Sequence, residues 1–413
     1  MRRALIAALA VVLFVAVGAS AAYRNLQGQI KTQDISDLLG DRPSDGASAP
    51  SDSYEGRAVN ILVMGSDSRD GQVVSSDGTE GMRSDTAMIV HLSADRKRMD
   101  VVSIPRDTMV DIPSCTLPDG STSEEQSYAM FNSAFSTGVA GSTKADDVKY
   151  AAACTVKTVE KLTGVYVDEY AVVDFTGFET MVDALGGVPM YISEDIDDDK
   201  ADLHLKAGCQ TLTGAEALGY ARARYSIGDG SDLSRIGRQQ QLVAAIMRTA
   251  LSKNLLTDLP TLYKFMQSAL ATLTVSPNIG NLTTLAGLAR SVDAIGLDNI
   301  NFVTMPNETD PYNANHVVPS DAAAGVWTSL KEDKAISAEN VTLAADGTSP
   351  SQAAQAATTA PAQAATTAPA QDTATTQAPA ASATTQAPAT KASAKTTEPS
   401  STATTVDPAT QCH

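Results

Sequence analysis

Short apolar runs of strand length recur along the first three quarters of the chain and predict the strands of one core sheet. They cover residues 59–64, 99–104, 170–173, 188–192 and 300–305. Between them, apolar residues recur at helical spacing over residues 146–162, 176–185, 233–251 and 282–294. Gly164 follows the first of these segments and Gly186-Gly187 follows the second, where glycine commonly ends a helix. Strands that alternate with helices predict an α/β fold, a three-layer αβα single domain with a mixed sheet between the helices.

The N-terminal segment 4–22 is apolar apart from Gly18 and Ser20, and Arg2 and Arg3 precede it. A run of this length can span a bilayer, and the basic residues before it place the N-terminus in the cytoplasm. A cleaved signal peptide is the alternative, because residues 19–21 (Ala-Ser-Ala) have the pattern of a cleavage site. The run is longer than the apolar region of most signal peptides, so we expect a single-pass membrane anchor at residues 1–23. Both alternatives export the rest of the chain.

The composition changes twice more along the chain. Residues 24–57 are rich in Ser, Asp and Gly and predict an extracytoplasmic stalk, which leaves residues 58–343 for the folded domain. Residues 344–413 are rich in Ala, Thr, Pro and Gln, and the sequence QAATTAPA occurs twice in succession at 355–370. Such a segment has no large apolar residues to offset its ordering entropy, so we expect it to be disordered. It could serve as a spacer through a cell wall or only as a solubilising linker.

The formal net charge of the 413 residues is −18 at pH 7. A nucleic-acid-binding protein needs a basic face, so this charge argues against DNA or RNA as a partner. Four cysteines without a CxxC pair and only four histidines argue against a zinc site. Export permits disulfides, and we expect one between Cys115 and Cys154, with buried free thiols as the alternative. The sequence leaves open how Cys209 and Cys412 are paired.

Arginines stand beside the predicted strand ends, where open α/β sheets bind their ligands. Arg83 follows a loop rich in Gly, Ser and Asp, and Arg106 follows the second predicted strand. Arginine suits phosphate because its planar fork donates two parallel hydrogen bonds and stays charged. Arg222 and Arg224 would lie on one side of an extended segment, whereas on a helix they would diverge by about 200°. We therefore expect an extended segment there, although each of these arginines could instead pair with a structural carboxylate.

Asp67 and Asp85 bring negative charge to the same region. Magnesium is commonly held by one or two carboxylates together with phosphate oxygens of a substrate, so these residues could hold a metal-bridged pyrophosphate. They could also cap turns or helices, which the spacing alone favours. The aspartate-rich run at 195–199 predicts a solvated loop.

Five motifs in order carry a family resemblance over residues 60–241: GSDSR, RSDT, SIPRD, YAVVDFTGFETMVDALGGV and YARARYSIGDGSDLSRIGRQQ. Together they resemble the LytR–CpsA–Psr family. The resemblance implies a membrane-anchored extracytoplasmic phosphotransferase that moves a glycopolymer from polyprenyl (pyro)phosphate to peptidoglycan or a surface glycoprotein. It also allows a pyrophosphatase side activity.

The resemblance assigns roles to individual residues. Asp67 and Asp85 match the Mg²⁺ positions; Arg83, Arg106, Arg222 and Arg224 match those that hold the pyrophosphate; Arg238 and Gln239 complete the site. Apolar positions between 172 and 185 match the region around the family's lipid tunnel, although most are expected to be ordinary core. The long loop at 70–82 departs from the pattern and puts the register between Asp67 and Arg83 in doubt.

The resulting mechanism is in-line phosphoryl transfer, with Arg106 stabilising the leaving group and Asp107 as a candidate general base. Asp107 could equally be a structural partner of an arginine. A non-catalytic protein that binds polyprenyl phosphate or the cell wall is the first alternative. A transcriptional attenuator is the second, and both the anchor's orientation and the acidic charge argue against it. The sequence does not identify the glycan or the length of the lipid.

Overall fold

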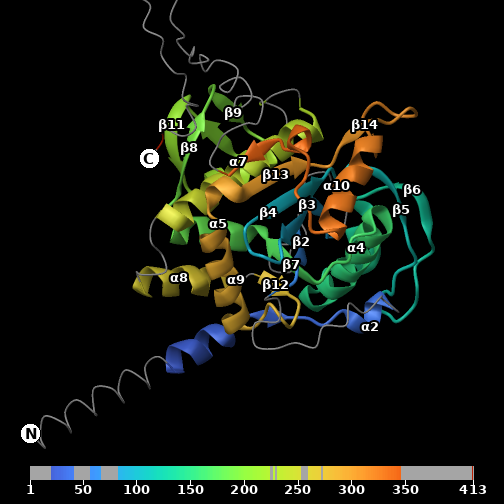
Figure 1. Cartoon of the computed structure of the whole chain (residues 1–413), viewed down its shortest axis with the longest axis horizontal. Coiled ribbons are helices and arrows are strands. Elements are labelled where there is room, and N and C mark those ends of the chain that lie inside the picture. Colours follow the sequence, from blue (N-terminus) through green and yellow to red (C-terminus); the bar gives the residue numbers. More distant parts are fainter. Residues whose placement is uncertain are drawn as a thin grey trace, which may run out of the picture.

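A mixed eight-stranded sheet runs through the middle of the domain (Figure 1). The computed structural model describes residues 20–40, 56–66, 82–223, 227, 230–252, 259–270, 273–345 and 412. From one edge to the other, the strands are β1 (Lys31–Thr32), β12 (Leu273–Val275), β7 (Glu169–Asp174), β2 (Val59–Ser66), β3 (Ser84–Leu92), β4 (Met99–Ile104), β13 (Ile300–Thr304) and β16 (Leu343–Ala344). Strands β7, β2, β4 and β13 run in one direction, and β3 lies antiparallel between β2 and β4.

Helices cover both faces of this sheet. On one face, Leu62 and Val102 pack with Phe135 of α3 and Trp327 of α10 in the largest buried cluster. On the other face, Phe302 packs in a second cluster with residues of α7 and α9. The helices are α2 (Ser36–Leu39), α3 (Ser133–Val139), α4 (Val148–Thr163), α5 (Phe175–Ala184), α6 (Gly214–Arg222), α7 (Asp232–Ser252), α8 (Leu259–Leu270), α9 (Leu282–Ile295) and α10 (Asp321–Lys331), with short 3₁₀ turns at Ala145–Asp147, Leu297–Asn299 and Ala338–Asn340. The predicted α/β fold with a mixed sheet between helices is therefore confirmed.

In the described part of the chain, four two-stranded sheets surround the main sheet. They pair β5 (Met109–Ile112) with β6 (Gln126–Met130), β8 (Val188–Ile192) with β11 (Gly208–Leu212), β9 (Ile196–Asp198) with β10 (Leu203–Leu205), and β14 (Asn307–Thr309) with β15 (Val317–Pro319). Two predictions need correction here. The strand at 188–192 has the predicted bounds but belongs to a side hairpin, and the run expected to be a solvated loop contains β9, in which Asp198 is buried.

Helix α4 illustrates how local sequence sets an element's end. Gly164 follows it with φ of 65°, and its N–H donates to the carbonyl of Glu160 at 2.8 Å. Only glycine adopts this left-handed conformation without a steric penalty, so the helix ends where the sequence predicts. The N-terminus of α5 is set by Asp174, whose Oδ1 accepts a hydrogen bond from the N–H of Gly177 at 2.7 Å.

The segment before β2 is partly integral to the domain, which corrects the predicted stalk at 24–57. Strand β1 extends the main sheet beside β12, and Ile35 and Leu39 are buried in the largest core cluster. The hydroxyl of Tyr170 also donates to the carbonyl of Gln33 at 2.6 Å. The domain therefore begins well before residue 58. Of the predicted anchor, residues 1–19 lie outside the described part of the chain, and no described helix is long and apolar enough to cross a membrane.

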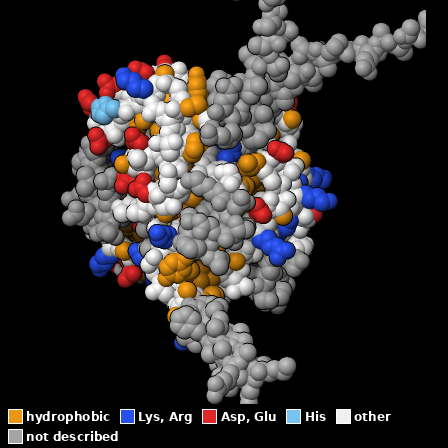
Figure 2. Space-filling model, turned by 90° about the vertical axis from the view of Figure 1, so that its left-hand side faces the viewer, with side chains coloured by type: hydrophobic (Ala, Val, Ile, Leu, Met, Phe, Trp, Pro, Cys, Tyr) orange, Lys and Arg blue, Asp and Glu red, His pale blue; other side chains and the backbone are white. Residues whose placement is uncertain are grey.

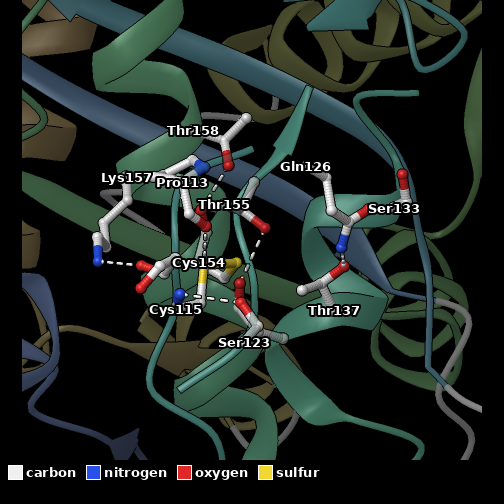
Figure 3. Close-up of a disulfide and its surroundings, with 12 residues drawn as sticks. Pro113, Cys115, Ser123, Gln126, Ser133, Thr137, Cys154, Thr155, Lys157 and Thr158 are labelled. Carbon is white, nitrogen blue, oxygen red and sulfur yellow. Dashed lines mark hydrogen bonds between the residues drawn. A yellow bond between two sulfur atoms is a disulfide. The ribbon is translucent and has the colours of Figure 1, made fainter. Parts of the chain in front are cut away.

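Cys115 and Cys154, the pair expected from the sequence, are bonded to each other (Figure 3). The bond ties the loop after β5 to the middle of α4, and the two Cα atoms are 5.4 Å apart. Both cysteines are buried, and the N–H of Cys115 donates to Oγ of Ser123 at 3.0 Å. The disulfide thus holds the segment that continues from Arg106 and Asp107 against the main core.

Replacing Cys115 and Cys154 together with alanine should lower the free energy of unfolding by about 3–4 kcal/mol, because the unfolded chain regains the entropy of the opened loop. The two cysteines are 39 positions apart in the sequence. Urea unfolding of the variant and of the wild type, both without reductant, measures the difference. An unchanged free energy would show that the bond does not constrain the unfolded chain.

A second disulfide joins Cys209 on β11 to Cys412, with Cα atoms 5.3 Å apart. The predicted tail at 344–413 therefore contains one residue that is fixed to the domain. Its first residue, Ala344, belongs to β16, and Ala345 is buried, so the predicted boundary falls inside that strand. The predicted disorder of residues 346–411 concerns residues outside the described part of the chain.

Candidate active site

Four neighbouring strands in the middle of the main sheet have polar residues where they meet at the carboxyl ends of the parallel strands. Strands β2, β4 and β7 finish there, and the antiparallel β3 starts there, so Ser66 lies opposite both Ser84 and Asp174. Ala87 of β3 pairs with Ile104 of β4. Continuing this antiparallel register by two residues places Asp85 opposite Arg106. The RSDT motif, expected to follow a loop, thus lies at the beginning of a central strand that the sequence analysis did not predict.

Arg106 is the centre of this arrangement. Its Nη1 donates to Oδ1 of Asp85 at 2.7 Å, and its Nε lies 3.3 Å from Oδ1 of Asp107. Asp232, at the start of α7, accepts a hydrogen bond from the backbone N–H of Arg106 at 3.0 Å, and its Oδ1 lies 3.6 Å from Nε. Burial disfavours the charged guanidinium, but Asp85 and Asp107 outweigh it and raise the pKa of Arg106. The side chain therefore stays cationic.

Asp232 and Arg235 belong to this site although the sequence analysis did not assign them. They form an ion pair between nearly inaccessible side chains, and Nη2 of Arg235 also donates to the carbonyl of Asp85 at 3.2 Å. Burial raises the pKa of Asp232, while Arg235 opposes that rise. The i,i+3 spacing of an acid and a base at the start of a predicted helix was the sequence signal for this pair.

Arg238 and Gln239 are buried, and their side chains donate hydrogen bonds to backbone carbonyls at the end of α6. Nη2 of Arg238 donates to the carbonyl of Ala223, and Nε2 of Gln239 donates to the carbonyl of Ala221 at 3.1 Å. These contacts position the backbone on both sides of Arg222. Nη1 of Arg238 also donates to Oγ of Ser234 at 3.0 Å, so the described hydrogen bonds of both side chains are made to protein groups of α6 and α7.

Arg222 is the last residue of α6, so the extended conformation expected for Arg222 and Arg224 is wrong at Arg222. A capping box between Thr213 and Glu216 begins the helix, and this local signal favours helix over strand. The guanidinium of Arg222 lies over the ring of Phe175, with Cζ 4.8 Å from the ring centroid. Arg224, which was expected beside it, lies outside the described residues.

The remaining predicted site residues are Arg83 and the two metal candidates. Arg83 directly precedes β3 and is partly buried, whereas Asp67 lies outside the described residues. Among the carboxylates around Arg106, the side chain of Asp85 is 36% exposed, compared with 18% for Asp107 and 7% for Asp232. Asp85 is thus the most accessible. Carboxylate oxygens suit a hard cation such as Mg²⁺, so the described donor set fits this ion.

The sequence model of the LytR_cpsA_psr family matches residues 22–332. The chain belongs to this family. The match begins before β1 and α2, in agreement with the packing of that segment in the fold. The predicted family is therefore confirmed.

Relatives of this LytR_cpsA_psr protein include two from Corynebacterium glutamicum. The probable cell wall biosynthesis protein LcpB is 33% identical over 224 residues, which are 52% of this chain and 48% of LcpB. The cell wall biosynthesis protein LcpA is 31% identical over 266 residues, 60% of this chain and 50% of LcpA. The chain thus spans about half the length of these curated relatives.

The fold is shared with a solved structure. The LytR-Csp2A-Psr enzyme from Actinomyces oris superposes with a TM-score of 0.51 at 18% identity, over 73% of this chain and 96% of that one. At this identity the superposition establishes a common fold.

Proposed function

We propose that this LytR_cpsA_psr protein is a membrane-anchored, extracytoplasmic phosphotransferase that attaches a polyprenyl (pyro)phosphate-linked glycopolymer to peptidoglycan. The observation that carries the proposal is the cationic Arg106 after β4, with Arg235 at the carbonyl of the neighbouring Asp85 and with Arg222 over Phe175, which follows β7 of the same sheet. Guanidinium groups fixed on rigid elements suit a pyrophosphate, because their donors are already oriented when the substrate arrives. Membership of the family and relatives named as cell wall biosynthesis proteins support the same substrate class.

The proposed reaction is an in-line displacement at phosphorus. A hydroxyl oxygen of a peptidoglycan sugar attacks the phosphorus that carries the glycan, and a new P–O bond forms. The bond from this phosphorus to the bridging oxygen breaks, and polyprenyl phosphate leaves with the electron pair. Asp107, close to Arg106, is our candidate to accept the proton of the hydroxyl. The guanidinium of Arg106 stabilises the charge that develops on the phosphate oxygens.

We propose that Mg²⁺ is held by Asp85 and Asp67. When bound, the ion would neutralise pyrophosphate charge beside Arg106. The accessible carboxylate of Asp85 already lies within hydrogen-bond distance of Arg106, so one residue can connect the cation to the arginine.

An apolar flank beside the site supports a lipid-linked donor. Helix α5 starts at Phe175, beside Arg222, and α8 packs against α5. Leu262, Phe265 and Met266 on α8 are only partly buried and lie outside the four buried apolar clusters of the described residues. Apolar side chains (orange) reach the surface on the side of the molecule that carries α8 (Figure 2). A polyprenyl chain would suit such a surface.

The two disulfides support the proposed location outside the cytoplasm. All four cysteines of the chain are paired, Cys115 with Cys154 and Cys209 with Cys412. Structural disulfides form and persist in oxidising compartments. Anchoring by residues 1–23 remains our proposal for how the domain is held at the membrane.

Full-length protein in detergent, a polyprenyl-pyrophosphate-linked glycan, peptidoglycan fragments and Mg²⁺ test the proposal. We expect release of polyprenyl phosphate and formation of a phosphodiester between glycan and peptidoglycan, each measured by mass spectrometry. Tight binding of the donor without release of polyprenyl phosphate would instead identify a binding protein.

In this assay, Asp85→Asn should raise the Mg²⁺ concentration needed for half-maximal transfer about tenfold, because the metal loses a charged oxygen ligand. A magnesium titration of the transfer rate measures the shift. Asp95→Asn is the matched control, since Asp95 lies on a surface turn and forms hydrogen bonds with Ser93 and Lys97. An unchanged magnesium dependence in Asp85→Asn would remove Asp85 from the metal site.

A further inference from the structure

Exposed aromatic side chains gather on two hairpins beside the site, the hairpin of β5 and β6 and the hairpin of β14 and β15. The described residues leave six large apolar or aromatic side chains exposed, and three of them, Tyr128, Met130 and Tyr312, lie on these hairpins. Tyr312 is 84% exposed, and its ring meets that of Tyr128 edge to face with centroids 5.7 Å apart. Such a cluster on a protein surface commonly marks a binding site.

The structure holds this aromatic pair in a fixed and strained conformation. Tyr128 has a φ of 55°, which bulky residues rarely adopt. Its hydroxyl donates to Oδ1 of the buried Asp310, and this hydrogen bond raises the pKa of Tyr128 to about 12. The same Oδ1 accepts the N–H of Tyr312 at 2.9 Å. One buried carboxylate therefore orients both tyrosines, and the hydroxyl stays protonated at physiological pH.

The two hairpins are connected directly to the backbone at Arg106. The N–H of Asn132, just after β6, donates to the carbonyl of Arg106 at 3.1 Å. The N–H of Val317, the first residue of β15, donates to the carbonyl of Asp107 at 3.2 Å. Tyr128 is four residues before Asn132, so at a strand's rise it lies on the order of 13 Å along the chain from the site.

The tyrosines lie on the opposite side of the site from the apolar flank. Helix α5 follows β7, and the hairpin of β14 and β15 follows β13. In the sheet, β2, β3 and β4 separate β7 from β13, so Arg106 and Asp85 stand between the two flanks. Figure 1 shows α5 and β14 on opposite sides of the domain.

In an in-line displacement the attacking and leaving oxygens are on opposite sides of phosphorus. If the leaving lipid phosphate occupies the α5 flank, the acceptor arrives from the tyrosine flank.

We propose that Tyr128 and Tyr312 form a docking surface for the sugar rings of the acceptor glycan strand. This inference rests on the proposed transfer reaction. The face of a pyranose ring carries C–H groups that pack on an aromatic ring, and its edge carries hydroxyls that need hydrogen-bonding partners. Next to Tyr312, Asn313 and Asn315 are exposed and His316 is partly exposed, which supplies such partners. The surface therefore combines the two kinds of contact that sugars require.

Replacing Tyr312 with alanine should raise the KM for peptidoglycan fragments roughly five- to tenfold and leave the KM for the lipid-linked donor unchanged. Tyr312 is so exposed that the fold should not depend on it. Calorimetry with a soluble peptidoglycan tetrasaccharide should show the same loss of affinity in the full-length protein. Tyr312→Phe should bind the tetrasaccharide normally, because it keeps the ring.

Tyr191→Ala is the matched control, because Tyr191 is an exposed tyrosine on β8, in the hairpin with β11. Wild-type affinity for the tetrasaccharide in Tyr312→Ala would overturn the inference. A changed KM of Tyr312→Ala for the lipid-linked donor would also overturn it. So would a variant that binds the tetrasaccharide normally but binds phosphatidylglycerol vesicles more weakly than the wild type. If the wild type transfers no glycan but binds the tetrasaccharide, and Tyr312→Ala loses this binding, the glycan surface is supported and the proposed reaction is rejected.

Discussion

Replacing Arg106 with lysine should lower the rate of glycopolymer transfer about a hundredfold or more, nearly as much as replacing it with alanine. In the structure the guanidinium reaches two carboxylates at once, Asp85 through Nη1 and Asp107 through Nε. A lysine has a single ammonium group and cannot keep the contacts with both carboxylates. It also cannot offer two parallel donors to phosphate oxygens, so charge alone does not restore the site.

Single-turnover transfer rates of wild type, Arg106→Lys and Arg106→Ala measure this effect, with the melting temperature recorded for each. Arg57→Lys is the matched control, because Arg57 forms an ion pair with Asp168 at 2.6 Å outside the proposed site. It should retain the wild-type rate. Near wild-type turnover in Arg106→Lys would falsify the bidentate role.

Replacing Asp232 with alanine should lower the free energy of unfolding by about 3–5 kcal/mol, the usual cost of removing one partner from a buried ion pair. The change takes the carboxylate of Asp232 away from Arg235, whose side chain is 3% exposed. It also removes the acceptor of the backbone N–H of Arg106. The loss should therefore exceed that of most single substitutions.

Urea unfolding measures this loss, and a second substitution isolates its cause. Asp232→Ala combined with Arg235→Met removes both charges, and much of the lost stability should return because no unpaired charge is left buried. A double variant as unstable as Asp232→Ala alone would mean that the uncompensated arginine is not the source of the loss.

Local sequence predicted the elements well where burial alone decides them. The run 99–104 became β4 with the same bounds, since all six of its residues are buried. Strand β3 was not predicted, because it begins with the polar Ser84 and Asp85, although its partner β4 follows closely in sequence. The run 188–192 had the right bounds and the wrong sheet, because its pattern does not specify which strand pairs with it. Strand partnership is nonlocal, and a single sequence does not specify it.

The candidate site was predicted where a motif lies at a strand end. Arg106, Asp107 and Asp85 came together as expected, since the register of β3 and β4 brings them opposite each other. The place of Asp232 and Arg235 in the site was missed, because the packing of α7, and not their local spacing, brings this pair to Arg106 and Asp85. The extended conformation expected at Arg222 was wrong, because the capping box of Thr213 and Glu216 starts a helix that continues to Arg222.

The bond between Cys209 and Cys412, which are 203 positions apart, closes this stretch of the chain into a covalent ring. A protease that cuts this ring once, at any peptide bond, produces two fragments that remain one molecule until a reductant is added. Residue 412 stays at β11 after such a cut, whatever path residues 346–411 follow. A truncation before residue 412 has a different consequence, since it opens the ring and leaves Cys209 with an unpaired thiol.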